Sequence, residues 1–254
     1  MRIALLSDVH ANLPVLQAVV DDLRRADAIE PFDGVYCLGD LGGYAAQSNE
    51  VQDLIMERGY PTIMGNYDEG VGFEREDCGC HYTKPFEIEM SNISFLWTRT
   101  RTTGAHKEWL RTLPREIRVV AGGQRLLLCH GSPRDTTEYL FETRSDGYLG
   151  QFTAGGTADA LADVIAFGHT HVPYHRVVDN VHFINAGSVG RPKDGDPRAG
   201  YCILTLDGEN AAAEQVRVPY DVELACARLV AAGLPDYFAA YLRSGGRAAV
   251  PGTA

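Results

Sequence analysis

Six short segments spread over most of the chain carry side chains that bind metal ions. They are Asp8-Val9-His10, Gly39-Asp40, Gly65-Asn66-Tyr67-Asp68, His130-Gly131, Gly168-His169-Thr170-His171 and Asn185-Ala186-Gly187-Ser188. The segments combine carboxylate and amide oxygens with imidazole nitrogens, a donor set that suits manganese, zinc, iron and similar divalent ions. Two such ions around one shared carboxylate would lower the pKa of a bridging water and direct it at phosphorus. The segments therefore predict two-metal chemistry on phosphate esters.

Alternating strands and helices must position these ligands. The residue patterns predict strands at 2–7, 34–38, 61–64, 115–121, 125–129, 163–167, 174–178, 181–185, 200–206 and 211–218. They predict a helix that begins near Asn12 and Pro14, and further helices at 48–58, 91–101, 103–112, 221–232 and 235–244, with weak helical character over 136–160. Residues 70–90 are rich in Gly, Cys and charge, and we expect them to form a loop over the mouth of the site.

The ends of the predicted strands are expected to bring the ligands together. Ligands in open α/β sheets bind outside the carboxyl ends of the strands. The candidate side chains that directly follow predicted strands are Asp8, Asp40, Asn66 and His130. Side chains two positions apart in extended backbone point to the same side. We therefore expect Asp8 with His10, and His169 with His171, to aim as pairs into one pocket.

Length and composition predict a globular protein with one domain. The chain has 254 residues, of which 45% are hydrophobic and 22% charged, so a large core can form. Because the candidate ligands run from Asp8 to Asn185, we expect a single domain over 1–254, with a motif core at 3–206 and a C-terminal strand and helices at 207–247. The longest apolar runs are as short as strands, so no membrane span is expected.

Charge and cysteine usage narrow the expected partners and compartment. The net charge of −11 argues against long nucleic acid and anionic membranes, which need basic patches. A small or activated phosphoester remains a suitable substrate, because bound cations would attract it locally. The six cysteines form no evident paired framework, which predicts a reduced, cytoplasmic setting. No feature of the sequence points to a particular oligomeric state.

In this order, the six segments resemble the motifs of the calcineurin-like metallophosphoesterase superfamily, over roughly residues 3–206. The compact size and the stretch Gly187-Ser188-Val189-Gly190-Arg191-Pro192 are similar to its small bacterial phosphodiesterase branch. The resemblance implies an α/β fold, a four-layer αββα sandwich of two mixed β-sheets flanked by helices. It also implies two divalent metal ions and hydrolysis by a metal-bridged hydroxide.

The resemblance assigns a role to each ligand. It places Asp8, His10 and His171 on the first metal. It places Asn66, His130 and His169 on the second metal, with Asp40 bridging the two ions. Asp40, Asn66 and His130 are thereby expected to take part in catalysis.

The third motif departs from the family pattern at Tyr67. Much of the family has a histidine there, which contacts the phosphate and can protonate the leaving group. Loss of that acid should hurt phosphomonoesters most, because their alkoxide leaving groups are poor. The departure therefore favours phosphodiesters, with Tyr67 as a hydrogen-bond donor to the substrate. Asp68 would orient the missing histidine, which leaves its role here open.

Candidate substrate contacts flank the motifs. Arg191, Lys193 and Arg198 form a short basic cluster that could hold a substrate phosphate, or simply a solvated turn. Cys78-Gly79-Cys80-His81 lacks the second ligand pair of a structural zinc site, so surface thiols are the simpler interpretation. His81 is a candidate replacement for the absent acid.

Two other functions fit the same scaffold. One is a phosphoprotein or dinucleoside-polyphosphate phosphatase, which would differ in the rim of the site. The other is a catalytically silent binding module, as in one retromer subunit. Such a module is expected to have eroded ligands, whereas the ligand set here is complete.

Overall fold

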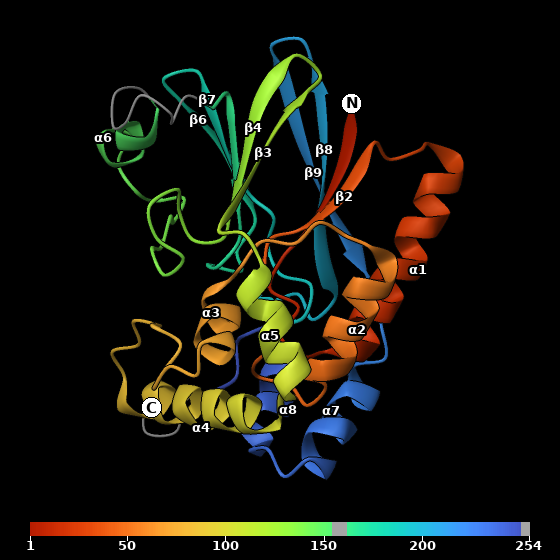
Figure 1. Cartoon of the computed structure of the whole chain (residues 1–254), viewed down its shortest axis with the longest axis vertical. Helices are drawn as coiled ribbons and strands as arrows, with labels where there is room; N and C mark the ends of the chain where they lie inside the picture. The colour runs from red at the N-terminus through yellow and green to blue at the C-terminus, as the bar shows by residue number, and fades with distance from the viewer. Residues whose placement is uncertain (154–161, 250–254) are drawn as a thin grey trace.

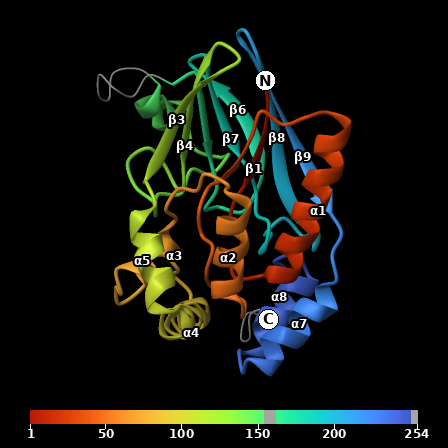
Figure 2. The same cartoon turned by 45° about the vertical axis from the view of Figure 1, so that its right-hand side comes forward.

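The computed structural model describes residues 1–153 and 162–249, and its strands form two stacked mixed sheets (Figures 1 and 2). In spatial order, the first sheet consists of β2 (Gly34–Cys37), β1 (Arg2–Leu6), β8 (Ala199–Asp207) and β9 (Asn210–Val218). The second consists of β3 (Glu116–Ala121), β4 (Gln124–Cys129), β5 (Val164–Phe167), β7 (Val181–Asn185) and β6 (Tyr174–Val178). In each sheet the strands that precede the motifs pair in parallel: β1 with β2 in the first sheet, and β4 with β5 and β5 with β7 in the second.

Helices cover the sheets and gather below the strand ends (Figure 1). They are α1 (Leu13–Ile29), α2 (Ser48–Arg58), α3 (Asn66–Gly72), α4 (Pro85–Arg101), α5 (Gly104–Thr112), α6 (Asp146–Leu149), α7 (Val222–Ala231) and α8 (Asp236–Arg243). Of these, α1 lies on the outer side of the first sheet, and α2 packs against α1 below the strand ends (Figure 2). The short helix α6 lies beside the second sheet (Figure 1). The expected α/β fold with two mixed sheets and flanking helices is confirmed. None of the described helices combines the length and the apolar character that crossing a bilayer requires.

Three buried clusters hold the layers together. Leu5, Leu128 and Leu204 belong to the cluster between the two sheets. A second cluster lies under the helices of the first sheet, and a third lies on the far face of the second sheet. Each fully buried side chain of this kind contributes about 1.5–3 kcal/mol relative to its exposed state. The central cluster therefore fixes the strand ends that carry the motifs.

Local sequence signals set two of the boundaries as expected. The Asn12 side chain accepts a hydrogen bond from the Val15 amide at 3.4 Å, so it caps α1. Gly122 and Gly123 join β3 to β4 with φ values of 57° and 87°, the left-handed pair that a two-residue hairpin needs.

Three predicted elements differ from the structure. Residues 61–64 form no strand, because only Thr62 pairs with Cys37 and Pro61 lacks an amide proton. The expected loop 70–90 is shorter, since α3 continues to Gly72 and α4 begins at Pro85, a favoured first helical residue. Within 136–160, helix is confined to α6 and a 3-10 turn that ends at Phe152, and residues 154–161 lie outside the described part.

Candidate metal centre

Two triads of buried side chains meet below the strand ends. The first contains Asp8, His10 and His171, and the second contains Asp40, His130 and His169. Within each triad, one ligand atom per residue lies within 4.8 Å of the others. The grouping agrees with the assignment that the resemblance implies, in which His169 and His171 serve different metals.

Asp40 lies between the triads. Its Oδ2 atom is 3.8 Å from His10 Nε2 in the first triad and 3.5 Å from His130 Nε2 in the second. Asn66 joins the second triad, because its Oδ1 atom is 3.1 Å from His130 Nε2. This is the arrangement that a bridging carboxylate between two cations requires.

Backbone carbonyls fix which nitrogen each histidine presents. The Nδ1 atoms of His10 and His130 contact the carbonyls of Gly42 at 2.8 Å and Leu38 at 2.7 Å. A carbonyl can only accept, so Nδ1 carries a proton and Nε2 is the nitrogen that faces the triad. His171 follows the same pattern, with its Nδ1 atom 2.5 Å from the Arg191 carbonyl. In His169 the two ring nitrogens exchange roles. Its Nε2 atom contacts the Thr137 carbonyl at 3.2 Å, so Nδ1 is the nitrogen left for the triad.

The ligand backbone is left-handed rather than extended. The φ angles lie between 49° and 63° at Asp8, His10, Asp40, His169 and His171. Left-handed backbone costs about 1–3 kcal/mol at a residue other than glycine, and such strain concentrates at functional sites. The expectation that Asp8 with His10, and His169 with His171, point the same way because their backbone is extended is therefore wrong. Tight turns after the strands, and not strand pleating, aim the ligands.

The donor atoms fit a cation. Asp8 Oδ1 is buried with no hydrogen-bond partner among the described residues, and it lies 3.2 Å from His171 Nε2. His10 Nε2 and His171 Nε2 are 3.2 Å apart, although both of these histidines direct their Nδ1 protons to carbonyls. Two lone pairs that face each other at this distance repel unless a cation lies between them. An orphaned carboxylate oxygen and converging lone pairs thus match a divalent metal.

The buried charges shift the ionisation of the ligands. Burial raises the pKa of Asp8, but the combined effects of His171, His10 and His130 outweigh it, and the pKa lies well below its ordinary value. Burial would lower the pKa of His130, but the Asp40 carboxylate raises it to about 10. Burial lowers the pKa of His169 to about 3. Ionised carboxylates and a neutral His169 are the forms that bind metals.

Asp68 is a clamp on the backbone, a role that the motif alone left open. Its Oδ2 atom accepts hydrogen bonds from the amides of Asp40 at 2.8 Å and Gly65 at 2.9 Å, and its Oδ1 atom accepts from Leu41 at 3.0 Å. Burial, followed by the Asp40 charge, raises the pKa of Asp68 to about 6. The carboxylate therefore ties the turn that carries Asp40 to the start of α3.

Tyr67 packs into the site wall. Its amide donates to Asp40 Oδ1 at 2.8 Å, and its ring lies 5.6 Å from the ring of His10. The phenol oxygen is 3.2 Å from Ser94 Oγ in α4. The hydroxyl is thus engaged by a helix, and its catalytic role stays a prediction.

The two cysteines beside the site are not surface thiols, and that expectation is wrong. Cys78 is buried and Cys80 is half-buried, with their sulfurs 2.7 Å apart. The Asn66 amide donates to the Cys78 carbonyl at 2.8 Å and to Cys80 Sγ at 3.3 Å. The cysteine segment therefore orients the amide ligand, and it packs against the site instead of facing solvent.

The neighbouring His81 is exposed and lines an open cavity with Arg134.

The three members of the basic cluster lie in different environments. Arg191 is buried, whereas Arg198 is exposed and its guanidinium pairs with Asp196 at 2.6 Å. This ion pair neutralises Arg198 at the surface and does not favour a substrate contact. Lys193 is close enough to the first triad to lower the pKa of His171, although burial is the larger cause.

Asn185 and Ser188 shape the turn beside the site, as the sequence favours. Asn185 donates to the Gly168 carbonyl at 2.7 Å, and Ser188 Oγ donates to the Asp8 carbonyl at 2.8 Å. Motif reasoning missed aromatic residues beside the ligands, because their signals are single positions. The ring of Tyr44 lies 5.0 Å from that of His10, the ring of Tyr139 lies 4.2 Å from that of His169, and Tyr241 shares a small cavity with His10.

Comparison with known proteins gives a family match over most of the chain. Residues 1–209 match the model of the calcineurin-like phosphoesterase superfamily domain. An uncharacterized protein of Methanocaldococcus jannaschii is 31% identical over 253 residues, covering 92% of this chain and 94% of that protein. A probable metallophosphoesterase of Methanothermobacter thermautotrophicus is 35% identical over 95 residues, covering 37% of this chain and 46% of that protein.

Solved structures share the fold over nearly the whole length. A metallophosphoesterase from Sphaerobacter thermophilus superposes with a TM-score of 0.71 at 29% identity, covering 96% of this chain and 99% of the other. A hypothetical protein from Pyrococcus horikoshii superposes with a TM-score of 0.79 at 19% identity, covering 97% and 99%.

Proposed function

The chain belongs to the calcineurin-like phosphoesterase superfamily, and from this premise we propose that it is a metal-dependent phosphodiesterase. The observation that carries the proposal is the position of Asp40 between two buried triads, 3.8 Å from His10 and 3.5 Å from His130. Asp8, His10 and His171 would hold one cation, and Asn66, His130 and His169 the other. When bound, two cations supply a hydroxide at neutral pH and neutralise charge that develops on the phosphoryl oxygens.

The residues of the chain hold this machinery in place. Carbonyl contacts to Nδ1 keep the Nε2 atoms of three histidines aimed inward. The Asp68 clamp and the Tyr67 amide orient the carboxylate of Asp40. Such supporting contacts raise metal affinity and activity by about 10–100-fold.

Preference for diesters follows from the position of Tyr67. A histidine acid is absent there, and the phenol of Tyr67 contacts Ser94 at 3.2 Å. An alkyl monoester depends most on an acid that protonates its leaving group, whereas a diester or a phenyl ester depends on such an acid less. The substrate is therefore a small diester or activated ester rather than an alkyl monoester.

Hydrolysis of bis-p-nitrophenyl phosphate with added manganese tests the proposal. We expect turnover that falls by at least about 100-fold in Asp40→Asn and in His130→Ala, because each change removes a ligand. Asp207→Asn, at an exposed position at the end of β8, is the matched control. Robust turnover after metal stripping and in excess chelator would contradict the proposal. Bound manganese without any turnover would instead support a silent binding module.

A further inference from the structure

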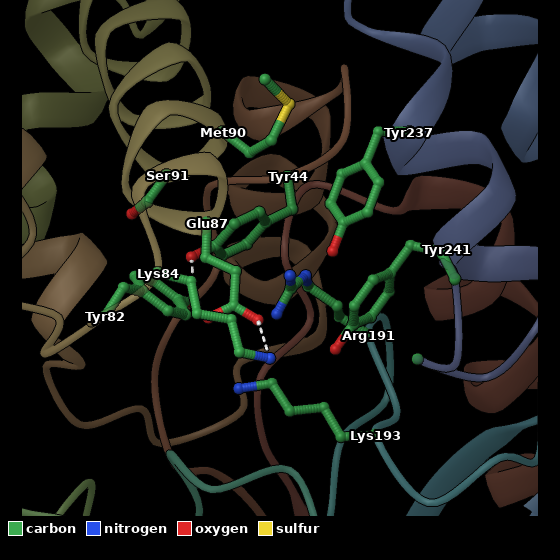
Figure 3. A pocket seen from close by; sticks show the side chains of 12 residues that line it. Tyr44, Tyr82, Lys84, Glu87, Met90, Ser91, Arg191, Lys193, Tyr237 and Tyr241 are labelled. Atoms are coloured by element: carbon green, nitrogen blue, oxygen red, sulfur yellow. Dashed lines mark hydrogen bonds and ion pairs between the residues drawn. The ribbon is translucent and has the colours of Figure 1, made fainter. Parts of the chain in front are cut away.

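A cavity of about 320 Å³ lies beside the first triad (Figure 3). We call it the arginine–tyrosine cavity, and the lining residues that matter here are Tyr44, Tyr82, Tyr237, Tyr241, Arg191 and Lys193. Tyr237 and Tyr241 come from α8, whereas Tyr82 precedes α4, so segments far apart in the sequence build its walls (Figure 3). None of the ligands that the metals require lies in this lining.

The guanidinium of Arg191 forms no ion pair with any residue that the structure describes. The side chain is only 6% exposed, and its Nη1 atom is buried with no hydrogen-bond partner among the described residues. Its nearest neighbours are the rings of Tyr44 and Tyr241, at 3.8 Å and 4.0 Å from the guanidinium carbon. Stacking on two aromatic rings stabilises the guanidinium by less than the burial of an unpaired charge costs. An anion in the cavity would supply the missing partner.

Lys193 adds a second cation to the same space. Lys193 lies below Arg191 in the view of Figure 3, and both side chains line the cavity. Burial, followed by the charge of Arg191, lowers the pKa of Lys193 to about 8. Glu87 also lines the cavity, but it pairs with Lys84 at 3.7 Å. The two cations therefore leave a net positive cavity that a tetrahedral dianion fits.

The cavity adjoins the metal centre without merging with it. The ring of Tyr44 lies between the two, 5.0 Å from the ring of His10 on one side and against Arg191 on the other. A phosphoryl group held by the triads is thus separated from the guanidinium by one ring. His10, Tyr44 and Arg191 also share a much smaller cavity, so the two spaces are neighbours.

We propose that the arginine–tyrosine cavity binds a second phosphate group of the substrate, so that the preferred substrate is a phosphodiester with an additional terminal phosphate. The scissile diester lies at the triads and the terminal phosphate lies against Arg191 and Lys193. The tyrosine hydroxyls donate further hydrogen bonds to its oxygens. The volume of the cavity is large enough for the part of the substrate that carries the terminal phosphate, about the size of one nucleotide. The substrate class rests on the proposed phosphodiesterase function, whereas the anion site does not.

Sulfate binding to metal-free protein tests the anion site independently of activity. Sulfate is a tetrahedral dianion, and its heat of binding can be titrated without any bound metal. We expect one site in the native chain and at least a ten-fold weaker affinity in Arg191→Gln. Arg243→Gln is the matched control, because Arg243 lies on α8 beyond Tyr241 and pairs with Glu223 at the surface. Equal sulfate affinity in the native chain and Arg191→Gln would overturn the proposal.

A pair of dinucleotides tests the substrate class. The manganese-loaded enzyme is assayed with dithymidine phosphate with and without a 5′-terminal phosphate, so that the scissile diester is the same. We expect kcat/KM to be at least ten-fold higher with the terminal phosphate, and this ratio to fall below three-fold in Arg191→Gln. A ratio near one in the native enzyme would overturn the substrate class, even where sulfate binds.

Two controls separate binding from folding. Arg191 packs between rings, so Arg191→Lys, which keeps the charge, is measured beside Arg191→Gln together with melting temperature and metal content. We expect Arg191→Lys to retain the sulfate affinity within about three-fold. If Arg191 acted only through packing between the rings, both variants would lose sulfate affinity alike. If neither dinucleotide nor bis-p-nitrophenyl phosphate is hydrolysed, the phosphodiesterase proposal and the substrate class fail together. The sulfate titration then still decides the anion site.

Discussion

Asp68 Oδ2 accepts a hydrogen bond of 2.8 Å from the amide of Asp40, the residue that we propose as the bridge between two metal ions. The same carboxylate binds the amides of Leu41 and Gly65, so one side chain ties the turn after β2 to the start of α3. Its charge lies close to that of Asp40, and with burial this raises the pKa of Asp68 to about 6. Bound cations would compensate both carboxylates. The clamp is therefore coupled to metal binding.

Asp68→Asn should weaken metal binding more than it weakens the metal-free fold. The variant loses an acceptor, which costs about 1–3 kcal/mol when a buried amide is left unpaired. In metal-free protein at pH 7, relief of repulsion with Asp40 offsets part of this cost. With metals bound the offset disappears, and we expect the manganese affinity to fall by roughly ten-fold. Melting curves with and without manganese check this, and an equal loss in both states would contradict it.

Gly65→Ala should displace the bridging carboxylate. A Cβ atom at this position would lie 2.2 Å from Asp40 Oδ1 and 2.3 Å from the Asp40 amide nitrogen. Overpacking of this kind costs about 1–3 kcal/mol, and here it pushes on the shared ligand itself. We expect substoichiometric metal and at least about a 100-fold loss of diesterase activity.

The matched control for Gly65→Ala is Gly104→Ala, at the first residue of α5. A Cβ atom there meets no other group within 4 Å. We expect its stability to change by less than about 0.5 kcal/mol. Full metal content and activity in Gly65→Ala would refute the close approach as the reason for glycine.

The sequence predicts that these candidate ligands meet, because parallel strands end at a common edge. Asp8, Asp40 and His130 each follow such a strand, and the structure brings all three together. The turns that aim them could not be predicted, because left-handed backbone at Asp8 or His169 has no local signature in residue type. Tertiary contacts impose it, among them the hydrogen bond from the His169 amide to Asp8 Oδ2 at 3.0 Å.

The same limit explains what the sequence missed around the ligands. The segment Asn-Tyr-Asp-Glu-Gly-Val-Gly of α3 contains two glycines and has low helix propensity, so it was expected to be loop after its motif. Burial of the whole helix overrides that propensity. The arginine–tyrosine cavity joins Tyr44, Arg191 and Tyr241, which no spacing rule relates. Such a site exists only once the chain has folded.

Metal binding should release a proton from His130. In the metal-free protein Asp40 raises the pKa of His130 to about 10, against the effect of burial, so the ring is protonated at pH 8. A metal ligand must be neutral, so binding expels this proton and the apparent affinity rises as pH increases toward 10. Manganese titrations in two buffers of different ionisation enthalpy should show release of about one proton at pH 8. His130→Ala should release fewer, and identical release in both proteins would contradict the assignment.

Tyr67→His should shift selectivity toward monoesters. The phenol of Tyr67 contacts Ser94 Oγ at 3.2 Å, and its ring lies 5.6 Å from the ring of His10, so an imidazole at this position starts beside the first triad. A protonated imidazole can donate a proton to an alkoxide leaving group, which increases rates by about 10²–10⁴-fold when the geometry is good. Because imidazole is smaller than phenol, it does not fill the space of Tyr67 and is positioned less well. We therefore expect a gain of only about ten-fold in kcat/KM for glycerol 2-phosphate relative to bis-p-nitrophenyl phosphate. The monoester rate should also decline at high pH as the imidazolium loses its proton.

The control variant is Tyr67→Phe, which loses the Ser94 contact and with it about 0.5–1.5 kcal/mol of stability. It should keep the original selectivity. If the histidine variant shows the same substrate ratio and pH profile as Tyr67→Phe, the absence of an acid is not what sets the preference for diesters.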